Sequence, residues 1–185
     1  MSLPKEARRR LFFALWPSAA MQEALASAAR RTIESLRSGR PVPRGNLHLT
    51  LAFLGSVPES SVEVLEDAAR RLDRAGAVTI TFDAIEYWAR AEILCAAARS
   101  APQVAAAFAQ TLKQALLSNG FAPDLKPFRP HVTLARQVRQ RPSECALAQV
   151  SWTFGEFALM ESRSSPEGSL YSVVASWPLY GDEGS

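Results

Sequence analysis

The stretch His48-Leu49-Thr50-Leu51 recurs 83 positions later as His131-Val132-Thr133-Leu134. These two phrases contain both histidines of the 185-residue chain and two of its seven threonines. If the threonines were scattered at random, both histidines would have one two positions later in only about one chain in seven hundred. We therefore interpret the repeat as one chemical device that the chain uses twice.

Both phrases are typical of β-strands, because the residues around them are aliphatic or β-branched and are bounded by Gly or Pro. Side chains two positions apart on a strand share a face. His48 and Thr50 should therefore point one way, as should His131 and Thr133, while the aliphatic residues between them point into a core. Two such strands could enclose one ligand from opposite sides.

This arrangement suits acid and base chemistry on a phosphate group. A neutral imidazole can take a proton from water while an imidazolium gives one to a leaving oxygen, and both act near neutral pH. Threonine hydroxyls can donate hydrogen bonds to phosphoryl oxygens as negative charge builds there. The competing interpretation is a pair of buried core histidines, beside threonines that are present only for their β-propensity.

The sequence around the two motifs resembles a known family. The segments that carry the resemblance are Arg10–Leu15, Asn46–Gly55 and Phe128–Arg136, and it runs from about Arg8 to Leu179. They are similar to the bacterial and archaeal RNA 2′,3′-cyclic phosphodiesterases, also called 2′-5′ RNA ligases, of the two-histidine phosphoesterase superfamily. The resemblance implies hydrolysis of RNA 2′,3′-cyclic phosphate ends to a 2′-phosphate without metal or cofactor, and weak 2′-5′ ligation in reverse.

The resemblance also implies a role for each motif residue. His48 becomes the general acid that protonates the 3′ oxygen and His131 the general base that activates water, although symmetry makes these roles exchangeable. Thr50 and Thr133 would hold the non-bridging oxygens. Arg136 lies five positions after His131 and would offset negative charge in the transition state. The alternative for Arg136 is a solvated surface arginine.

Further substrate contacts are predicted from position alone. Arg129, two positions before His131, could face the same groove, and flanking loops carry cations that could follow an RNA backbone, namely Arg40, Arg44 and Lys126. The candidates for stacking on a base are Phe13, Phe53, Trp88 and Tyr171. We favour Phe13 and Tyr171. Phe53 lies five positions after His48 and should face the opposite side of a regular strand.

Composition narrows the class of protein. The chain is 48% hydrophobic and 21% charged with a net charge of +3, which is typical of a globular protein with a slight preference for anionic partners. Cys95 and Cys145 lack metal-ligand spacing, which favours a cytoplasmic setting. No apolar run reaches membrane-spanning length, and the first one stops at Pro17, too early for a signal peptide. We expect a monomer that binds RNA ends, tRNA fragments included, but no metal, cofactor or membrane.

The chain also carries signs of an internal duplication. Adding 83 to a predicted strand at Arg8–Leu15 gives another at Ala91–Ala98, and two predicted helices begin at Ser18 and Ala101. The offset later shrinks to 72 because the second half lacks a helix at residues 140–148. We predict an α+β fold in a single bilobed domain over residues 1–185. Its two pseudo-symmetric lobes have mostly antiparallel sheets, helices on the outer faces and an active-site groove between them, and elements can cross between lobes.

Hydrophobic periodicity and turn residues place the individual elements. The predicted strands cover residues 8–16, 47–54, 78–88, 91–98, 151–162 and 169–177, with the second motif strand at residues 131–134. The predicted helices cover residues 19–37, 60–75 and 102–119.

Two other functions stay open. The first is a phosphodiesterase for a small nucleotide-derived cyclic phosphate, and the second is a non-catalytic module that binds RNA or nucleotides. Two histidines paired with two threonines argue against the module, because binding alone requires neither an acid nor a base.

Overall fold

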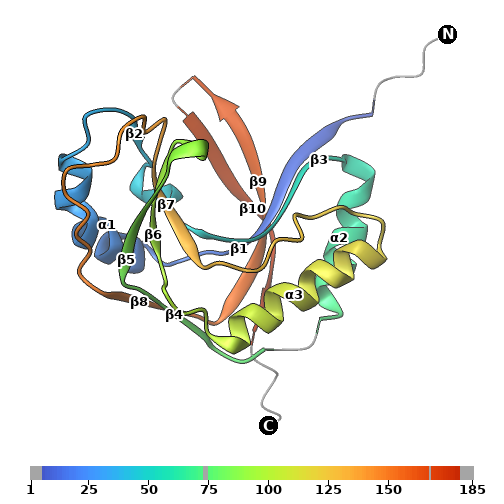
Figure 1. Ribbon diagram of the computed structural model, residues 1–185. Helices are drawn as coiled ribbons and strands as arrows, with labels where there is room; N and C mark the ends of the chain where they lie inside the picture. The colour runs from blue at the N-terminus through green and yellow to red at the C-terminus, as the bar shows by residue number, and fades with distance from the viewer. Residues whose placement is uncertain (1–5, 73–74, 167, 180–185) are drawn as a thin grey trace.

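A computed structural model describes residues 6–72, 75–166 and 168–179. It confirms the predicted α+β class, with helices packed on a mostly antiparallel sheet (Figure 1). None of the helices in this part of the chain is long and apolar enough to cross a membrane. The elements are β1 (Arg8–Leu15), α1 (Ala19–Glu34), β2 (Arg40–Pro41), β3 (Leu49–Pro58), α2 (Val62–Arg70), β4 (Val78–Phe82), β5 (Ala84–Trp88), β6 (Ile93–Ala97), α3 (Gln103–Ser118), β7 (His131–Arg136), β8 (Val150–Phe154), β9 (Glu156–Ser165) and β10 (Gly168–Pro178).

The main sheet has the strand order β10-β9-β1-β3-β7-β6-β5, with β2 beside β7, while β4 and β8 form a separate pair. The motif strands β3 and β7 lie in the middle (Figure 1). They share a single residue pair, Leu49 with Val132. The sheet is therefore nearly divided at its centre, with one histidine motif on each side of the division.

The three strands nearest the centre on each side follow an equivalent order, and β10 extends the sheet beyond them on one side only among the described residues. β3, β1 and β9 follow one another on one side, and β7, β6 and β5 on the other. β5 comes from the first half of the sequence but pairs with β6 of the second, and β9 crosses in the opposite sense to pair with β1. This exchange fits two related halves, and α1 and α3 each span 16 residues. The duplication itself stays a prediction.

One side of the central strands is buried against the helices. Leu49, Leu51, Val132 and Leu134 are at most 3% exposed. They belong to one cluster with apolar residues of α1 and α3, such as Leu25, Ala29, Phe108 and Leu112. The motif histidines and threonines, which alternate with these residues, therefore project from the opposite face, as the period of two predicts.

Several element boundaries differ from the predicted ones. Residues 78–88 are two strands because the chain changes partner at Asp83: β4 pairs with β8, and β5 with β6. Residues 151–162 divide in the same way at Gly155. β3 runs through Gly55 to Pro58, since Gly55 has a φ of 71° and accommodates an irregularity opposite Leu11. α2 ends at Arg70 rather than near residue 75.

Each motif strand contains a β-bulge directly after its threonine. On β3, Thr50 pairs with Ala14 and Ala52 with Phe13, so Leu51 is the extra residue. On β7, Thr133 pairs with Cys95 and Ala135 with Leu94, so Leu134 is the extra residue. A bulge places two consecutive side chains on the same side, which shifts the later residues by one position. The residue five positions after each histidine therefore returns to the face of that histidine.

This corrects the prediction for Phe53. A regular strand would turn Phe53 away from His48, but the bulge brings it to the motif face, opposite Phe12 of β1. Phe53 is 41% exposed there. Arg136 occupies the equivalent position after His131.

The prediction that Phe13 stacks on a base is wrong. Phe13 is 0% exposed, and its ring packs against Phe157 and Trp177 at centroid distances of 6.2 and 6.1 Å. Its neighbour Phe12 projects from the motif face instead, in contact with the His48 ring. The dipeptide Phe12-Phe13 offers one ring to each side, and only the pairing of β1 with β3 decides which ring faces the motifs.

Phe13→Ala should lower the free energy of unfolding by about 3–5 kcal/mol, because it leaves a cavity among large rings. Phe53→Ala should lower it by less than about 1 kcal/mol, since its exposed ring leaves no cavity in the core. Urea denaturation of the two variants beside the wild type measures both changes. Equal losses would contradict the assignment of the two rings to opposite faces of the sheet.

Candidate active site

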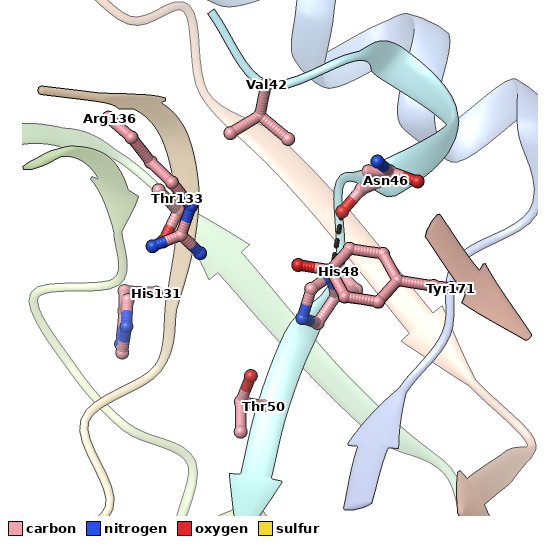
Figure 2. Close-up of a pocket in the computed structure, with 8 residues that line it drawn as sticks. All are labelled: Val42, Asn46, His48, Thr50, His131, Thr133, Arg136 and Tyr171. Carbon is pink, nitrogen blue, oxygen red and sulfur yellow. Dashed lines mark hydrogen bonds between the residues drawn. The ribbon is translucent and has the colours of Figure 1, made fainter. Parts of the chain in front are cut away.

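β3 and β7 bring the two motifs to opposite walls of one small cavity (Figure 2). All four motif residues line it, namely His48, Thr50, His131 and Thr133. Arg136 and Tyr171, two further predicted site residues, also line it, together with Val42 and Asn46. The histidines therefore face a common space and are not packed in separate parts of the core.

Both imidazoles are held in the same way. Nδ1 of His48 lies 2.7 Å from the carbonyl oxygen of Asn46 (Figure 2), and Nδ1 of His131 lies 2.8 Å from that of Arg129. A carbonyl oxygen can only accept, so each Nδ1 carries a hydrogen and donates it. Nε2 is then the nitrogen that can exchange a proton in each ring. In both motifs, therefore, the imidazole donates a hydrogen bond to the carbonyl oxygen two residues before it.

His48 lies in an aromatic surrounding. The Trp16 ring stacks on the imidazole at a centroid distance of 5.2 Å and an angle of 12°, and Phe12 and Tyr171 each lie 5.1 Å away. Burial lowers the pKa of His48 to about 4. The hydrogen bond to Asn46 opposes this shift, while the charges of Arg136 and His131 add to it.

His131 has a more polar surrounding. Its ring lies 4.7 Å from that of Trp88, and the Arg129 guanidinium lies 5.2 Å above the same indole. Glu86 accepts hydrogen bonds from Trp88 Nε1 at 2.8 Å and from Arg129 Nη2 at 2.7 Å. Burial is the main cause that lowers the pKa of His131, and the charge of Glu86 opposes it. No carboxylate acts on His48 in this way among the described residues.

The structure gives Arg129 a different place from the predicted one. Its guanidinium is occupied by Glu86 and Trp88, and it does not line the cavity. Arg129 instead contributes its carbonyl oxygen, which orients His131. Sequence reasoning also missed Glu86, because nothing in a single sequence indicates that the strand carrying it lies near His131.

Arg136 is positioned by the backbone on both sides of β7, through pairs with Arg40 of β2 and Ile93 of β6. Gly39 makes this approach possible: its φ is 98°, and a Cβ there would lie 2.8 Å from the Arg136 carbonyl oxygen. Arg136 lines the same cavity as Thr133 and His131 (Figure 2), and its positive charge acts on both histidines. It has no ion-pair partner within the described ranges, so it is available to an anion.

The other predicted cations do not line the cavity. Arg44 pairs with Glu23, and Lys126 with Asp124 at 3.6 Å. Arg40 contributes backbone pairing to β7. Their contact with an RNA backbone stays a prediction for more distant parts of a long substrate.

A second hollow adjoins the cavity and shares His48, Thr50, Arg136 and Tyr171 with it. It extends over the motif face of β1, β9 and β10. The residues that it adds are Arg10, Phe12, Phe53, Ser162, Ser164 and Ser169. No Asp or Glu lines either space, so the combined surface suits an anionic ligand. No local pattern in the sequence points to the three serines, because they reach the site only through the pairing of β9 with β1.

In the described part of the chain, no three His, Cys, Asp or Glu side chains gather closely enough to hold a metal ion. The cavity therefore has nitrogen and hydroxyl groups for chemistry but no ligand set for a divalent cation. Metal independence stays a prediction that a chelator can test.

Residues 19–166 match the family model of the 2′-5′ RNA ligase superfamily. The chain belongs to this superfamily. It is 31% identical over 173 residues to the RNA 2′,3′-cyclic phosphodiesterase of Escherichia coli (strain K12), covering 92% of this chain and 97% of that protein. It is 30% identical over 192 residues to the protein of the same name from Thermus thermophilus, covering 95% and 92% respectively.

Solved structures agree with the superfamily. The crystal structure of E. coli LigT complexed with 3′-AMP superposes with a TM-score of 0.85 at 28% identity, covering 95% of this chain and all of that one. The family resemblance predicted from the sequence is thereby confirmed. The fold that it implied is confirmed as well.

Glu86→Gln should lower the pKa of His131, because it removes the negative charge that favours the imidazolium. The pKa of His48 should change little, since Glu86 is not among the groups that act on it. The chain has two histidines, so NMR titration gives two ring signals, which His48→Gln assigns. An unchanged His131 pKa, or equal shifts in both rings, would contradict this view of the site.

Proposed function

We propose that this protein hydrolyses 2′,3′-cyclic phosphates at RNA ends to 2′-phosphates. The observation that carries the proposal is the cavity itself. Two imidazoles, each with Nδ1 anchored on a carbonyl, line one small space with two threonine hydroxyls and an unpaired guanidinium. The relatives named RNA 2′,3′-cyclic phosphodiesterase support the reaction, and LigT crystallised with 3′-AMP supports a nucleotide-sized ligand.

In the proposed reaction the oxygen of a water molecule attacks the phosphorus of the cyclic diester. His131 Nε2 takes a proton from this water as the new P–O bond forms. The bond from phosphorus to O3′ breaks, and His48 Nε2 gives its proton to O3′, which leaves the phosphate on O2′. His131 gains one proton and His48 loses one, and proton transfer through solvent then returns both rings to their starting states, so the reaction consumes only water.

The remaining lining residues would stabilise the transition state. Negative charge grows on the non-bridging oxygens during the attack, where Thr50 and Thr133 can donate hydrogen bonds. Arg136 can add a charge-assisted pair of hydrogen bonds. Tyr171 borders both the cavity and the adjoining hollow, which suits contact with the nucleoside next to the phosphate.

The lowered pKa values have a consequence for catalysis. Burial lowers the pKa of both rings and so disfavours their protonated form in the free protein, yet one ring must carry a proton to act as the acid. The bound phosphate is an anion beside both imidazoles, so it favours their protonated form and raises their pKa values. Binding of the substrate therefore favours protonation of the histidine that acts as the acid in its cleavage.

The profile of kcat/KM against pH should be bell-shaped with a maximum below pH 6.5. The limbs of kcat/KM report the free protein, where both imidazole pKa values lie below 6.5. The profile of kcat should peak at higher pH, because the bound phosphate raises those values. Initial rates with a cyclic-phosphate substrate, which stays a monoanion over this range, measure both profiles. A kcat/KM maximum well above pH 7 would contradict the proposed protonation states.

Purified protein should convert an oligoribonucleotide with a 2′,3′-cyclic phosphate end into the 2′-phosphate, with or without EDTA. His48→Ala and His131→Ala should each lower kcat by about 10²–10⁴-fold. Thr50→Ala and Thr133→Ala should each lower it by about tenfold or more, the value of one hydrogen bond to a charged group.

Chromatography against authentic 2′- and 3′-phosphate standards identifies the product, and Arg163→Gln, on the opposite face of β9, is the matched control. A 3′-phosphate product would contradict the assignment of the broken bond. Loss of the reaction in EDTA would overturn metal independence.

The same groups can run the reaction in reverse, with a 5′-hydroxyl in place of water. Water is present at about 55 M, so hydrolysis dominates unless the site holds a second RNA end. We place the protein in the cytoplasm as a monomer that acts on RNA ends such as tRNA fragments. Cys95 and Cys145 are both free thiols, which suits a reducing compartment.

A further inference from the structure

We infer that the hollow beside the catalytic cavity binds a second phosphate, on the 5′ side of the nucleoside that carries the cyclic phosphate, and that Arg10 holds it. The inference rests on the proposed function and extends it to the form of the substrate. A nucleoside cyclic phosphate alone would leave this position empty. An RNA end of two or more nucleotides, or a nucleotide with its own 5′-phosphate, would fill it.

The charges of the hollow indicate two anionic groups. Arg10 and Arg136 both line it, and no hydrogen bond or ion pair occupies either guanidinium within the described residues. The neighbours of Arg10 on β1 are engaged: Arg8 binds Ser56, and Arg9 binds Glu161 at 2.9 Å. No carboxylate lines this space to neutralise the two cations, so a ligand with two anionic groups would pair with both of them.

The two cations occupy different parts of this continuous space. Arg136 lines the catalytic cavity with Thr133 and His131 (Figure 2). Arg10 lies outside that cavity, four residues along β1 from Ala14, the residue that pairs with Thr50. Four residues of a strand span about 13 Å. The Arg10 guanidinium lies over the Phe53 ring, 4.9 Å from its centroid, so this charge and the exposed ring lie side by side in the hollow.

The surface between the cations fits a nucleoside. Phe53 is 41% exposed and Tyr171 half-buried, so both offer ring surface to a base. Ser162 is opposite Tyr171, and Ser164 is opposite Ser169, in the register of β9 and β10. These hydroxyls lie on the face of Arg10 and can donate to phosphate oxygens.

The carboxylate of Glu161 lies on the face of the sheet opposite to the hollow. Glu161 of β9 pairs with Leu11 in the register of β9 and β1, so its carboxylate projects away from the hollow. Arg9 and Arg163 neutralise it there at 2.9 and 3.0 Å. The positive charge of Arg10 is therefore not offset by this carboxylate, which strengthens its attraction for a phosphate.

Three substrates test the inference: a nucleoside 2′,3′-cyclic phosphate, the same compound with a 5′-phosphate, and a dinucleotide with a 5′-hydroxyl and a 2′,3′-cyclic end. For the wild type, kcat/KM should be about tenfold higher when the 5′-side phosphate is present, the effect of one charge-assisted hydrogen bond. Arg10→Met keeps the aliphatic stem but removes the charge. It should abolish this advantage, so that the ratio of kcat/KM between the larger substrates and the smallest one falls to about one.

Arg163→Gln is the matched control, because it removes one positive charge from the opposite face of the same sheet and should keep the advantage. Salt provides a second measure. For the dinucleotide, log kcat/KM should fall with log salt concentration less steeply in Arg10→Met, by about 0.7 for one lost phosphate contact. Thermal unfolding of each variant confirms that the exposed substitutions leave the fold intact.

The outcomes separate the inference from the proposed function. An advantage that persists in Arg10→Met, an equal fall on all three substrates, or no advantage in the wild type would overturn the second phosphate position. An advantage for both larger substrates supports recognition of the phosphate itself, and an advantage for the dinucleotide alone supports recognition of an internucleotide diester. Hydrolysis of none of them by the wild type would overturn the proposed function, and this inference with it.

Discussion

Burial of Leu49, Leu51, Val132 and Leu134 beneath the helices is the interaction on which the site depends. Each such side chain contributes about 1.5–3 kcal/mol when it leaves water. A slip of β3 or β7 by one residue would expose them and drive the imidazoles into the core. The core therefore fixes the direction in which the motif histidines and threonines point, and no contact inside the cavity has to supply that energy.

The two β-bulges bring further residues to the face of the sheet that carries the motifs. In a regular strand the face of each motif would continue at the fourth and sixth residue after the histidine. The extra residues Leu51 and Leu134 bring Phe53 and Arg136 to that face instead. In the proposed complex, the first bulge supplies an aromatic ring that can contact a base, and the second supplies a cation that can contact a phosphate.

Sequence reasoning succeeded where the information was local. Alternation along the strand predicted the shared face of His48 and Thr50, and the family resemblance pointed to Arg136. It failed for Phe53 because the bulge at Leu51 depends on how β3 pairs with its partner strand. It failed for Phe13 because the dipeptide Phe12-Phe13 does not show which ring faces the motifs until β1 pairs with β3. The carboxylate of Glu86 and the serines of β9 were missed for a related reason, since they reach the site through pairings between distant segments.

The two halves share a backbone plan but not an electrostatic one. Equivalent Nδ1 contacts hold His48 and His131, so their hydrogen-bond geometry does not indicate which ring is the acid and which is the base. Their surroundings differ, because aromatic rings enclose His48 whereas Glu86 acts on His131. A carboxylate favours the imidazolium, and hydrophobic enclosure disfavours it. Two chemically identical rings thereby acquire different proton affinities, and in the free protein the charge of Glu86 favours the proton at His131. For His48 to act as the acid, the bound phosphate has to raise the pKa of His48 more than that of His131.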